Sequence, residues 1–211
     1  MEAIKHKGIL IVLSAASGTG KTTVASELLA RSHQMVRSIS ATTRAPRGQE
    51  RHGGAYFFIT EAVFDETVKS GGFLEWASVH THRYGTPAGF VLDNIDSGRD
   101  VLLVIDVQGG RQIKRSFPDA VLVFLVPQSA DELRRRLYGR GTESAAETAV
   151  RLANAASEIE DSAGYDYVVV NDRIRDAADA ITAIVTAEKL KVCRMKEAVG
   201  RLALEFRGIA G

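Results

Sequence analysis

One segment near the N-terminus constrains the fold of this chain more than any other. Residues 8–13 read Gly-Ile-Leu-Ile-Val-Leu and are typical of a buried strand, and residues 14–23 read Ser-Ala-Ala-Ser-Gly-Thr-Gly-Lys-Thr-Thr. A strand, a turn of small residues and a helix aim backbone N–H groups and the positive helix end at an anion. The order predicts a nucleotide phosphate cradle in which Lys21 reaches the β- and γ-phosphates and Thr22 holds Mg²⁺.

This loop departs from the strict phosphate-loop pattern at one position, because Ala15 stands where the first glycine is expected. A small side chain there still lets phosphate approach. The alternative is a glycine-rich turn that caps a helix with an exposed lysine, and the preceding strand argues against it. The residues expected to contact ATP here are Ala15, Ala16, Ser17, Gly18, Thr19, Gly20, Lys21, Thr22 and Thr23.

Further apolar runs indicate the fold class. Residues 101–105, 121–126 and 167–170 are rich in Val, Ile and Leu and alternate with segments of helical period. Strands buried on both faces predict an α/β fold of the P-loop NTPase type, with a parallel sheet flanked by helices. Residues 40–89 and 139–147 interrupt the alternation and predict an inserted mixed α/β lobe and an arginine-bearing lid. The expected division is core 1–39, lobe 40–89, core 90–138, lid 139–147, core 148–189 and a C-terminal helical tail 190–211.

The composition and net charge of the chain limit the kinds of partner and the cellular compartment that we expect for it. The chain has 211 residues, and its 27 Lys and Arg against 26 Asp and Glu give a net charge of +1, so no general basic field favours nucleic acid or anionic membranes. The aliphatic run 9–13 is too short to span a bilayer. Cys193 is the only cysteine, which excludes an internal disulfide and favours a reducing, cytoplasmic compartment.

The inserted segment carries a second group of anion-binding candidates. Residues 40–48 read Ser-Ala-Thr-Thr-Arg-Ala-Pro-Arg-Gly and place Arg44 and Arg47 three residues apart. Planar guanidinium groups suit bidentate phosphate binding, and Tyr56 and Tyr84 add phenolic donors. The alternative is a solvated loop with two ordinary surface arginines.

From about residue 8 to 189 the chain resembles the guanylate kinase family. The motifs are the loop 14–22, Thr-Thr-Arg-x-Pro-Arg at 42–47, Phe-Leu-Glu-Trp-Ala at 73–77, Tyr-Gly-Thr at 84–86, Ile-Asp-Val-Gln-Gly at 105–109, Gly-Arg-Gly-Thr-Glu at 139–143 and Val-Asn-Asp at 170–172. The resemblance implies transfer of the γ-phosphoryl group of ATP to GMP with Mg²⁺. It also implies that one set of residues grips the GMP phosphate, namely Arg44, Arg47, Tyr56 and Tyr84. A second set meets the base, namely Ser40, Glu75 and Thr86.

The chemistry of guanine supports this base assignment independently. Guanine presents N1–H and N2–H₂ as adjacent donors, which one carboxylate such as Glu75 accepts together, and O6 requires a donor such as the Thr86 hydroxyl. Adenine inverts both patterns. An unpaired buried polar group costs about 1 to 3 kcal/mol, so such a site is expected to discriminate strongly.

Asp106 is expected to close the buried strand 101–105 and to orient a metal ion or its waters, besides belonging to the GMP site. Members of the family commonly carry a second acidic residue two positions earlier, where this chain has Val104. On a strand, residues 104 and 106 point to the same side, so we expect one carboxylate to be missing from the site.

Three arginines match the lid and hinge positions of the family. Arg136, Arg140 and Arg151 are expected to stabilise the charge on the transferred phosphoryl group together with Lys21. Asn171 resembles the position that meets the adenine of ATP, and a turn formed by Asn171 and Asp172 is the alternative.

Two other functions fit parts of the sequence. A non-catalytic binding module of the same fold lacks, as a rule, the phosphate loop that this chain retains. A kinase for another small phosphate acceptor remains open, because Val104 weakens the case that Glu75 and Thr86 make for guanine. The basic, amphipathic tail is a candidate surface for homo-oligomer formation.

Overall fold

The computed structural model describes residues 7–79, 81–138 and 145–209, and its core is a parallel sheet of five strands in the order β2-β7-β1-β8-β9. The strands are β1 (Leu10–Ala15), β2 (Met35–Arg37), β7 (Asp100–Val104), β8 (Val121–Pro127) and β9 (Tyr167–Asn171). The predicted α/β class with a helix-flanked parallel sheet is therefore confirmed. Strand β2 was not predicted, because three residues are too few to show a period.

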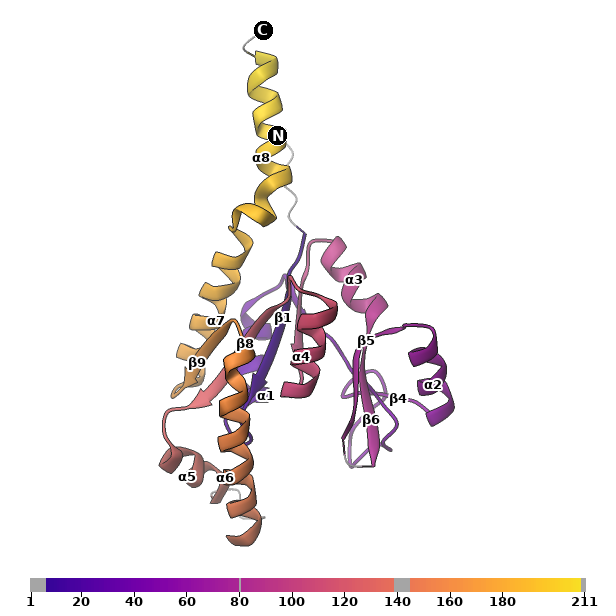
Figure 1. Ribbon diagram of the computed structural model, residues 1–211, viewed down its shortest axis with the longest axis vertical. Helices are drawn as coiled ribbons and strands as arrows, with labels where there is room; N and C mark the ends of the chain where they lie inside the picture. Colours follow the sequence, from indigo (N-terminus) through magenta and orange to yellow (C-terminus); the bar gives the residue numbers. More distant parts are fainter. Residues whose placement is uncertain (1–6, 80, 139–144, 210–211) are drawn as a thin grey trace.

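Helices cover both faces of this sheet (Figure 1). On one face lie α1 (Lys21–Arg31) and α7 (Ile174–Lys189), and on the other lie α3 (Ala88–Asp96) and α4 (Val107–Ser116). Along β1, Ile11 and Leu13 pack toward α1 and α7, whereas Leu10 and Val12 pack toward α3 and α4. Successive strand residues face opposite sides, so a central strand must be apolar throughout.

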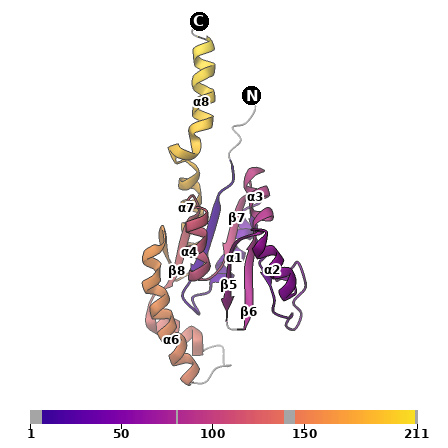
Figure 2. The same cartoon turned by 45° about the vertical axis from the view of Figure 1, so that its right-hand side comes forward.

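A second, smaller sheet is built from the segment predicted as an inserted lobe. Its strands run in the order β4-β3-β6-β5, with β3 (Ala41–Thr42), β4 (Phe57–Phe58), β5 (Phe73–Val79) and β6 (His82–Pro87). Helix α2 (Glu61–Lys69) begins after Thr60, whose side chain accepts a hydrogen bond from the Val63 N–H as its N-cap. The small sheet and α2 stand beside the core (Figure 2). The exact division into domains stays a prediction.

The segment after β8 carries the arginines predicted for the lid and hinge. Helix α5 (Ala130–Tyr138) is followed by α6 (Ala145–Glu160) and a short 3₁₀ turn, η1 (Asp161–Gly164). Of the predicted lid, residues 139–144 lie outside the described residues, and residues 145–147 form the start of α6. Phe124 of β8, Leu133 of α5 and Ala155 of α6 share a buried cluster that attaches these helices to the sheet.

The C-terminal helix α8 (Val192–Ile209) follows α7 and extends away from the core, as Figures 1 and 2 both show. Ala198 is its only buried residue among those described, and its outer part is exposed. No helix in the described part of the chain is long and apolar enough to cross a membrane.

Candidate active site

The predicted phosphate-binding loop connects the end of β1 to the start of α1. Gly18 and Gly20 have φ angles of 85° and 96°, a region that side chains other than glycine rarely adopt. Gly20 is the N-cap of α1, so the loop delivers Lys21 and Thr22 as the first two residues of the helix. Ala15 is the last residue of β1, where extended backbone needs no glycine. The departure from the strict pattern therefore leaves the turn intact.

Lys21 reaches from α1 across the end of the sheet. Its Nζ donates a hydrogen bond of 2.8 Å to the carbonyl oxygen of Ile105, which follows β7. Burial lowers the pKa of Lys21, and the nearby carboxylates of Asp106 and Glu158 oppose that shift. The half-buried side chain of Lys21 is therefore held in place by a carbonyl partner.

The carbonyl oxygen of Thr19 joins the loop to two predicted site residues. Asn171 Nδ2 donates to it at 2.6 Å and Arg136 Nη1 at 3.2 Å. Arg136 also donates to the carbonyl oxygens of Asn171 and Asp172, so it links α5, the loop and the end of β9. These residues border a hollow beside Gly18 and Gly20. Asn171 thus does more than form a turn with Asp172.

The side chains of Arg140 and Arg151, the other two arginines predicted to act on the transferred phosphoryl group, cannot be located relative to the loop. Arg140 lies outside the described residues, as does the side chain of Arg151, whose backbone belongs to α6.

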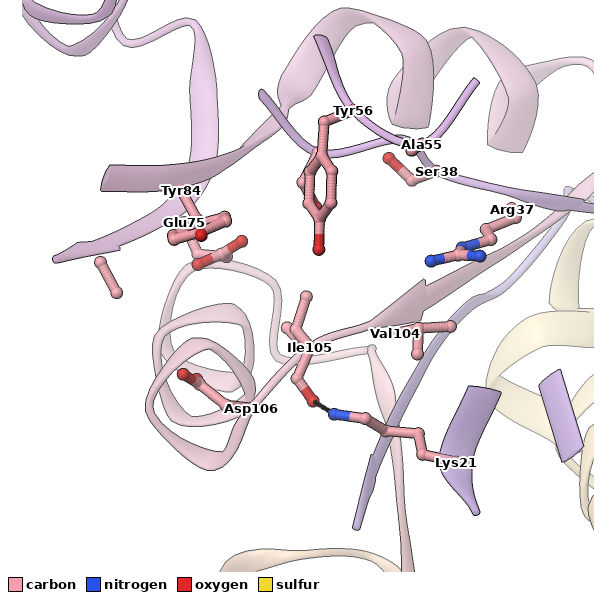
Figure 3. Close-up of a pocket in the computed structure, with 12 residues that line it drawn as sticks. Lys21, Arg37, Ser38, Ala55, Tyr56, Glu75, Tyr84, Val104, Ile105 and Asp106 are labelled. Atoms are coloured by element: carbon pink, nitrogen blue, oxygen red, sulfur yellow. Dashed lines mark hydrogen bonds between the residues drawn. The ribbon is translucent and has the colours of Figure 1, made fainter. Parts of the chain in front are cut away.

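A pocket between the core and the small sheet collects most of the predicted acceptor-site residues (Figure 3). Ser40, Tyr56, Glu75 and Tyr84 come from the segment of the small sheet, and Asp106 comes from the core. Lys21 borders the same pocket. The structure therefore brings the phosphate loop and the proposed GMP residues to one space. In Figure 3 the hydroxyl of Tyr56 points to the middle of this space.

Glu75 is the buried acid of this pocket. It is 7% exposed, and its Oε1 accepts a hydrogen bond of 2.6 Å from the hydroxyl of Thr86. Burial raises the pKa of Glu75 to about 7, helped by the charge of Asp106 and opposed by the Thr86 hydrogen bond. Thr86 itself is fully buried behind Glu75 and does not border the pocket.

Neither Arg44 nor Arg47 borders the pocket, although Arg44 contacts Tyr56, which does. The guanidinium of Arg44 donates to Glu50 Oε1 at 3.0 Å and to the Ala45 carbonyl at 2.8 Å, and it lies over the Tyr56 ring at 5.4 Å. Arg44 is 7% exposed, so it is not a solvated surface arginine. Arg47 is exposed, and its backbone N–H donates to Glu50 Oε2 at 2.8 Å.

The expectation that Asp106 closes a strand is wrong. Strand β7 ends at Val104, and Asp106 is the N-cap of α4, where its Oδ1 accepts a hydrogen bond of 2.8 Å from the Gly109 N–H. An aspartate caps a helix N-terminus well, and this local preference ends the strand early. Val104 and Asp106 therefore do not share one strand face, although both border the pocket.

The structure adds site residues that the sequence analysis did not single out. Arg37 and Ser38 border the same pocket as Lys21 and Glu75. Glu158 of α6 accepts a hydrogen bond of 2.7 Å from the Ser17 N–H in the phosphate loop. The available signal for Arg37 was a charged residue at the end of a three-residue strand, and a strand that short was not recognised.

The oxygen donors near the loop fit a magnesium ion that is held mainly by nucleotide. Thr22 and Asp106 are both exposed oxygen donors at the C-terminal edge of the sheet. In the described residues no three His, Cys, Asp or Glu side chains are grouped as a protein metal site. Mg²⁺ usually keeps several waters and binds one or two protein oxygens plus substrate phosphates, so this sparse set suits it.

A glycine-turn phosphate loop on a parallel sheet, facing a second pocket with a buried acid and two tyrosines, defines the class as a nucleoside monophosphate kinase. The family model for guanylate kinase matches residues 7–188. The guanylate kinase of Caldanaerobacter subterraneus subsp. tengcongensis is 45% identical over 92% of this chain and 95% of its own length. That of Thermotoga maritima is 43% identical over 96% of this chain and 98% of its own length. The crystal structure of guanylate kinase from Anaplasma phagocytophilum superimposes with a TM-score of 0.73, at 38% identity and 90% coverage of both chains.

The chain belongs to the guanylate kinase family. This match confirms the resemblance seen in the motifs, and the activity of the chain is that of an ATP:GMP phosphotransferase. A non-catalytic binding module is therefore no longer the leading interpretation.

Proposed function

We propose that the phosphoryl transfer takes place across the pocket that Lys21 and Glu75 share, with ATP on the phosphate loop and GMP against the small sheet. The main observation behind this proposal is that Lys21 of the phosphate loop and the buried acid Glu75 border the same pocket. In-line transfer needs the two nucleotides to approach from opposite sides. The pocket lies between the two sheets that would supply them.

Glu75 is the proposed reader of guanine. As a carboxylate it accepts both N1–H and N2–H₂ of the base. Thr86 has one hydroxyl proton and already donates it to Glu75, so we assign Thr86 a positioning role behind the carboxylate. Ser40 borders the pocket and is the proposed donor to O6. Asp106 has one oxygen engaged in capping α4, which leaves the other for the guanine amino group or for a magnesium-bound water.

The GMP phosphate is proposed to bind among Tyr56, Tyr84, Arg44 and Arg47. The ring centroids of the two tyrosines are 5.8 Å apart, and Arg44 lies over the Tyr56 ring. Phosphate binding would compete with Glu50 for the Arg44 guanidinium, since both are anions. Charge-assisted hydrogen bonds from arginine forks to phosphate are among the stronger ones in proteins.

On the ATP side, the loop residues 15–23 and Asn171 are proposed to bind the donor nucleotide, with Arg136 beside them. Thr22 and Asp106 are the residues that would hold Mg²⁺, which supplies charge neutralisation at the phosphates when it is bound. Arg140 and Arg151 are proposed to join Arg136 and Lys21 around the transferred group. A lobe 40–89 and a lid 139–147 that close on the core would exclude water from the reaction.

Acceptor specificity provides the direct test. We would measure ADP formation from ATP and Mg²⁺ with GMP, AMP, CMP or UMP offered separately. Turnover with GMP alone is expected, and Lys21→Ala is expected to reduce kcat at least about 100-fold because a preorganised cation is lost. Lys69→Ala, at an exposed site on α2, is the matched control. Comparable turnover of AMP would overturn the guanine assignment.

We also propose that α8 pairs with a second copy of the chain in the cytoplasm. Apolar residues recur along it with alternating spacings of three and four, as in a coiled-coil seam. They are Val192, Met195, Val199, Leu202, Phe206 and Ile209, and all but Met195 are exposed. Light scattering after size exclusion should show a dimer that Leu202→Asp dissociates and Arg201→Asp, at the next residue, does not. A monomeric parent protein would contradict the proposal.

A further inference from the structure

The pocket shared by Lys21 and Glu75 is bordered by a second cation, Arg37. Arg37 ends β2 and borders the pocket, and its guanidinium makes no hydrogen bond or ion pair with any residue that the structure describes. Its charge is close enough to Lys21 to lower the pKa of that lysine. An arginine that faces a pocket beside another cation is electrostatically unfavourable unless an anion enters.

A buried hydroxyl next to Arg37, that of Ser38, is also unpaired within the described part of the chain. Ser38 is 5% exposed, borders the same pocket, and has an Oγ without a hydrogen-bond partner among the described residues. Buried polar groups are nearly always hydrogen-bonded, so an orphaned hydroxyl at a pocket wall suggests that a ligand completes it. In Figure 3, Arg37 and Ser38 lie on one side of the pocket, and Glu75 and Tyr84 lie on the other.

The wall below Arg37 is apolar. Strands β2 and β7 pair with Arg37 opposite Leu102, and Val104 is two residues further along β7 on the same face. Figure 3 places Val104 between Arg37 and Lys21. A carboxylate at position 104 would stand in reach of both cations and neutralise them, whereas valine leaves them free. Because position 37 is arginine and position 104 is valine, this side of the pocket is positively charged, whereas a carboxylate at 104 would neutralise it.

We propose that Arg37 and Ser38 form an additional anion subsite that binds a phosphate oxygen of the nucleoside monophosphate, on the wall opposite Glu75. This inference rests on the proposed placement of GMP in the pocket and adds two residues to its phosphate contacts. The guanidinium supplies charge and a fork of donors, and the hydroxyl supplies one further donor. Val104 permits the subsite because position 104 supplies no carboxylate to compete with the phosphate for Arg37.

The test compares GMP with guanosine, which has the same base and no phosphate. Calorimetric titration should show that Arg37→Gln weakens GMP binding about 10- to 100-fold, the range for a lost charged hydrogen bond, and leaves guanosine binding unchanged. Arg37→Lys should restore part of the affinity. Arg99→Gln, which removes an exposed charge before β7, is the matched control. Equal weakening of both ligands, or of neither, would overturn the subsite.

Ser38→Ala provides an independent test, because it should change stability and GMP affinity in opposite directions. Removal of an orphaned buried hydroxyl should raise the Tm of the free protein, while GMP binding weakens and guanosine binding stays constant. A lower Tm would mean that the hydroxyl has a structural partner, and the subsite would lose its second donor.

A third variant tests the role of Val104. Val104→Asp should pair with Arg37 and weaken GMP binding, and Arg37→Gln should then have a smaller effect than in the parent protein. Additive effects of the two substitutions would contradict the coupling. These outcomes are distinct from failure of the proposed function, in which the unaltered protein would not phosphorylate GMP at all.

Discussion

The hydroxyl of Thr86 donates a 2.6 Å hydrogen bond to Oε1 of Glu75, and this bond opposes the effect of burial on the pKa of that carboxyl. Burial raises the pKa of Glu75 to about 7, so the free protein holds this acid near half protonation at neutral pH. Guanine needs the ionised form, because its N1–H and N2–H₂ are both donors.

Guanosine affinity should therefore rise with pH. Below the Glu75 pKa of about 7, affinity should fall about tenfold per pH unit as the acceptor is lost. Guanosine is the ligand of choice, since the GMP phosphate titrates near pH 6 and would obscure the effect. Competition binding from pH 5.5 to 8.5 measures it. A flat profile for the parent protein would show that Glu75 does not contact the base.

Thr86→Val should shift the midpoint of that pH profile to a higher pH. The Thr86 hydrogen bond lowers the pKa of Glu75, so its removal should raise the midpoint at which guanosine binds. At pH 8.5 the variant and parent should differ less than at pH 7. Thr67→Val, at a half-buried threonine on α2 whose hydroxyl donates to the Val63 carbonyl, serves as the control. A weaker affinity that is equal at every pH would assign Thr86 a direct contact instead.

The same acid should make stability depend on pH. The folded pKa of Glu75 lies above its unfolded value near 4.5, so between these values the native state binds more protons and stability falls as pH rises. Glu75→Gln removes the ionisation and keeps an acceptor for Thr86. From pH 5 to pH 8 the parent should lose about 2 kcal/mol relative to the variant, measured by urea unfolding. No difference in pH dependence would contradict the raised pKa.

Glu158 should compete with nucleotide phosphates. Its Oε2 accepts a 2.7 Å hydrogen bond from the Ser17 N–H, a donor in the loop proposed to bind ATP. Glu158→Gln reduces the negative charge at this position, and ADP binding should tighten several-fold in a calorimetric titration. Glu160→Gln, two residues along and exposed, is the matched control. Weaker ADP binding would instead indicate that Glu158 orders the loop.

Gly20→Ala tests the geometry of the loop. Gly20 has φ of 96°, and an added Cβ would lie 3.1 Å from Asn171 Nδ2, the donor to Thr19. The substitution should destabilise the fold by about 1 to 2 kcal/mol and weaken ATP binding. Gly89→Ala, with open space around its Cβ position in α3, should keep or slightly raise stability, because alanine favours a helix over glycine. Parent-like stability and ATP affinity in Gly20→Ala would show that the left-handed turn is dispensable.

Much of the fold follows from local patterns. The apolar run of β1 and the small residues after it predicted the strand, the loop and the first helix, because burial on both faces and positive φ angles each require particular residue types. Helix α2 starts directly after Thr60 for a similarly local reason, because threonine is a good N-cap. The same local chemistry explains an error, since Asp106 caps α4 instead of closing the strand, and β7 ends at Val104, one residue before the end of the apolar run.

The sequence alone determined the class of fold and the identity of the motif residues, since side-chain type and spacing act over a few neighbouring residues. Only the tertiary structure decided which of them meet. It placed Thr86 behind Glu75, joined Arg136 to Thr19, and brought Arg37, Ser38 and Val104 into one pocket wall. Those relationships depend on strand order and on burial among segments far apart in the chain, and burial rather than residue type sets the pKa of Glu75.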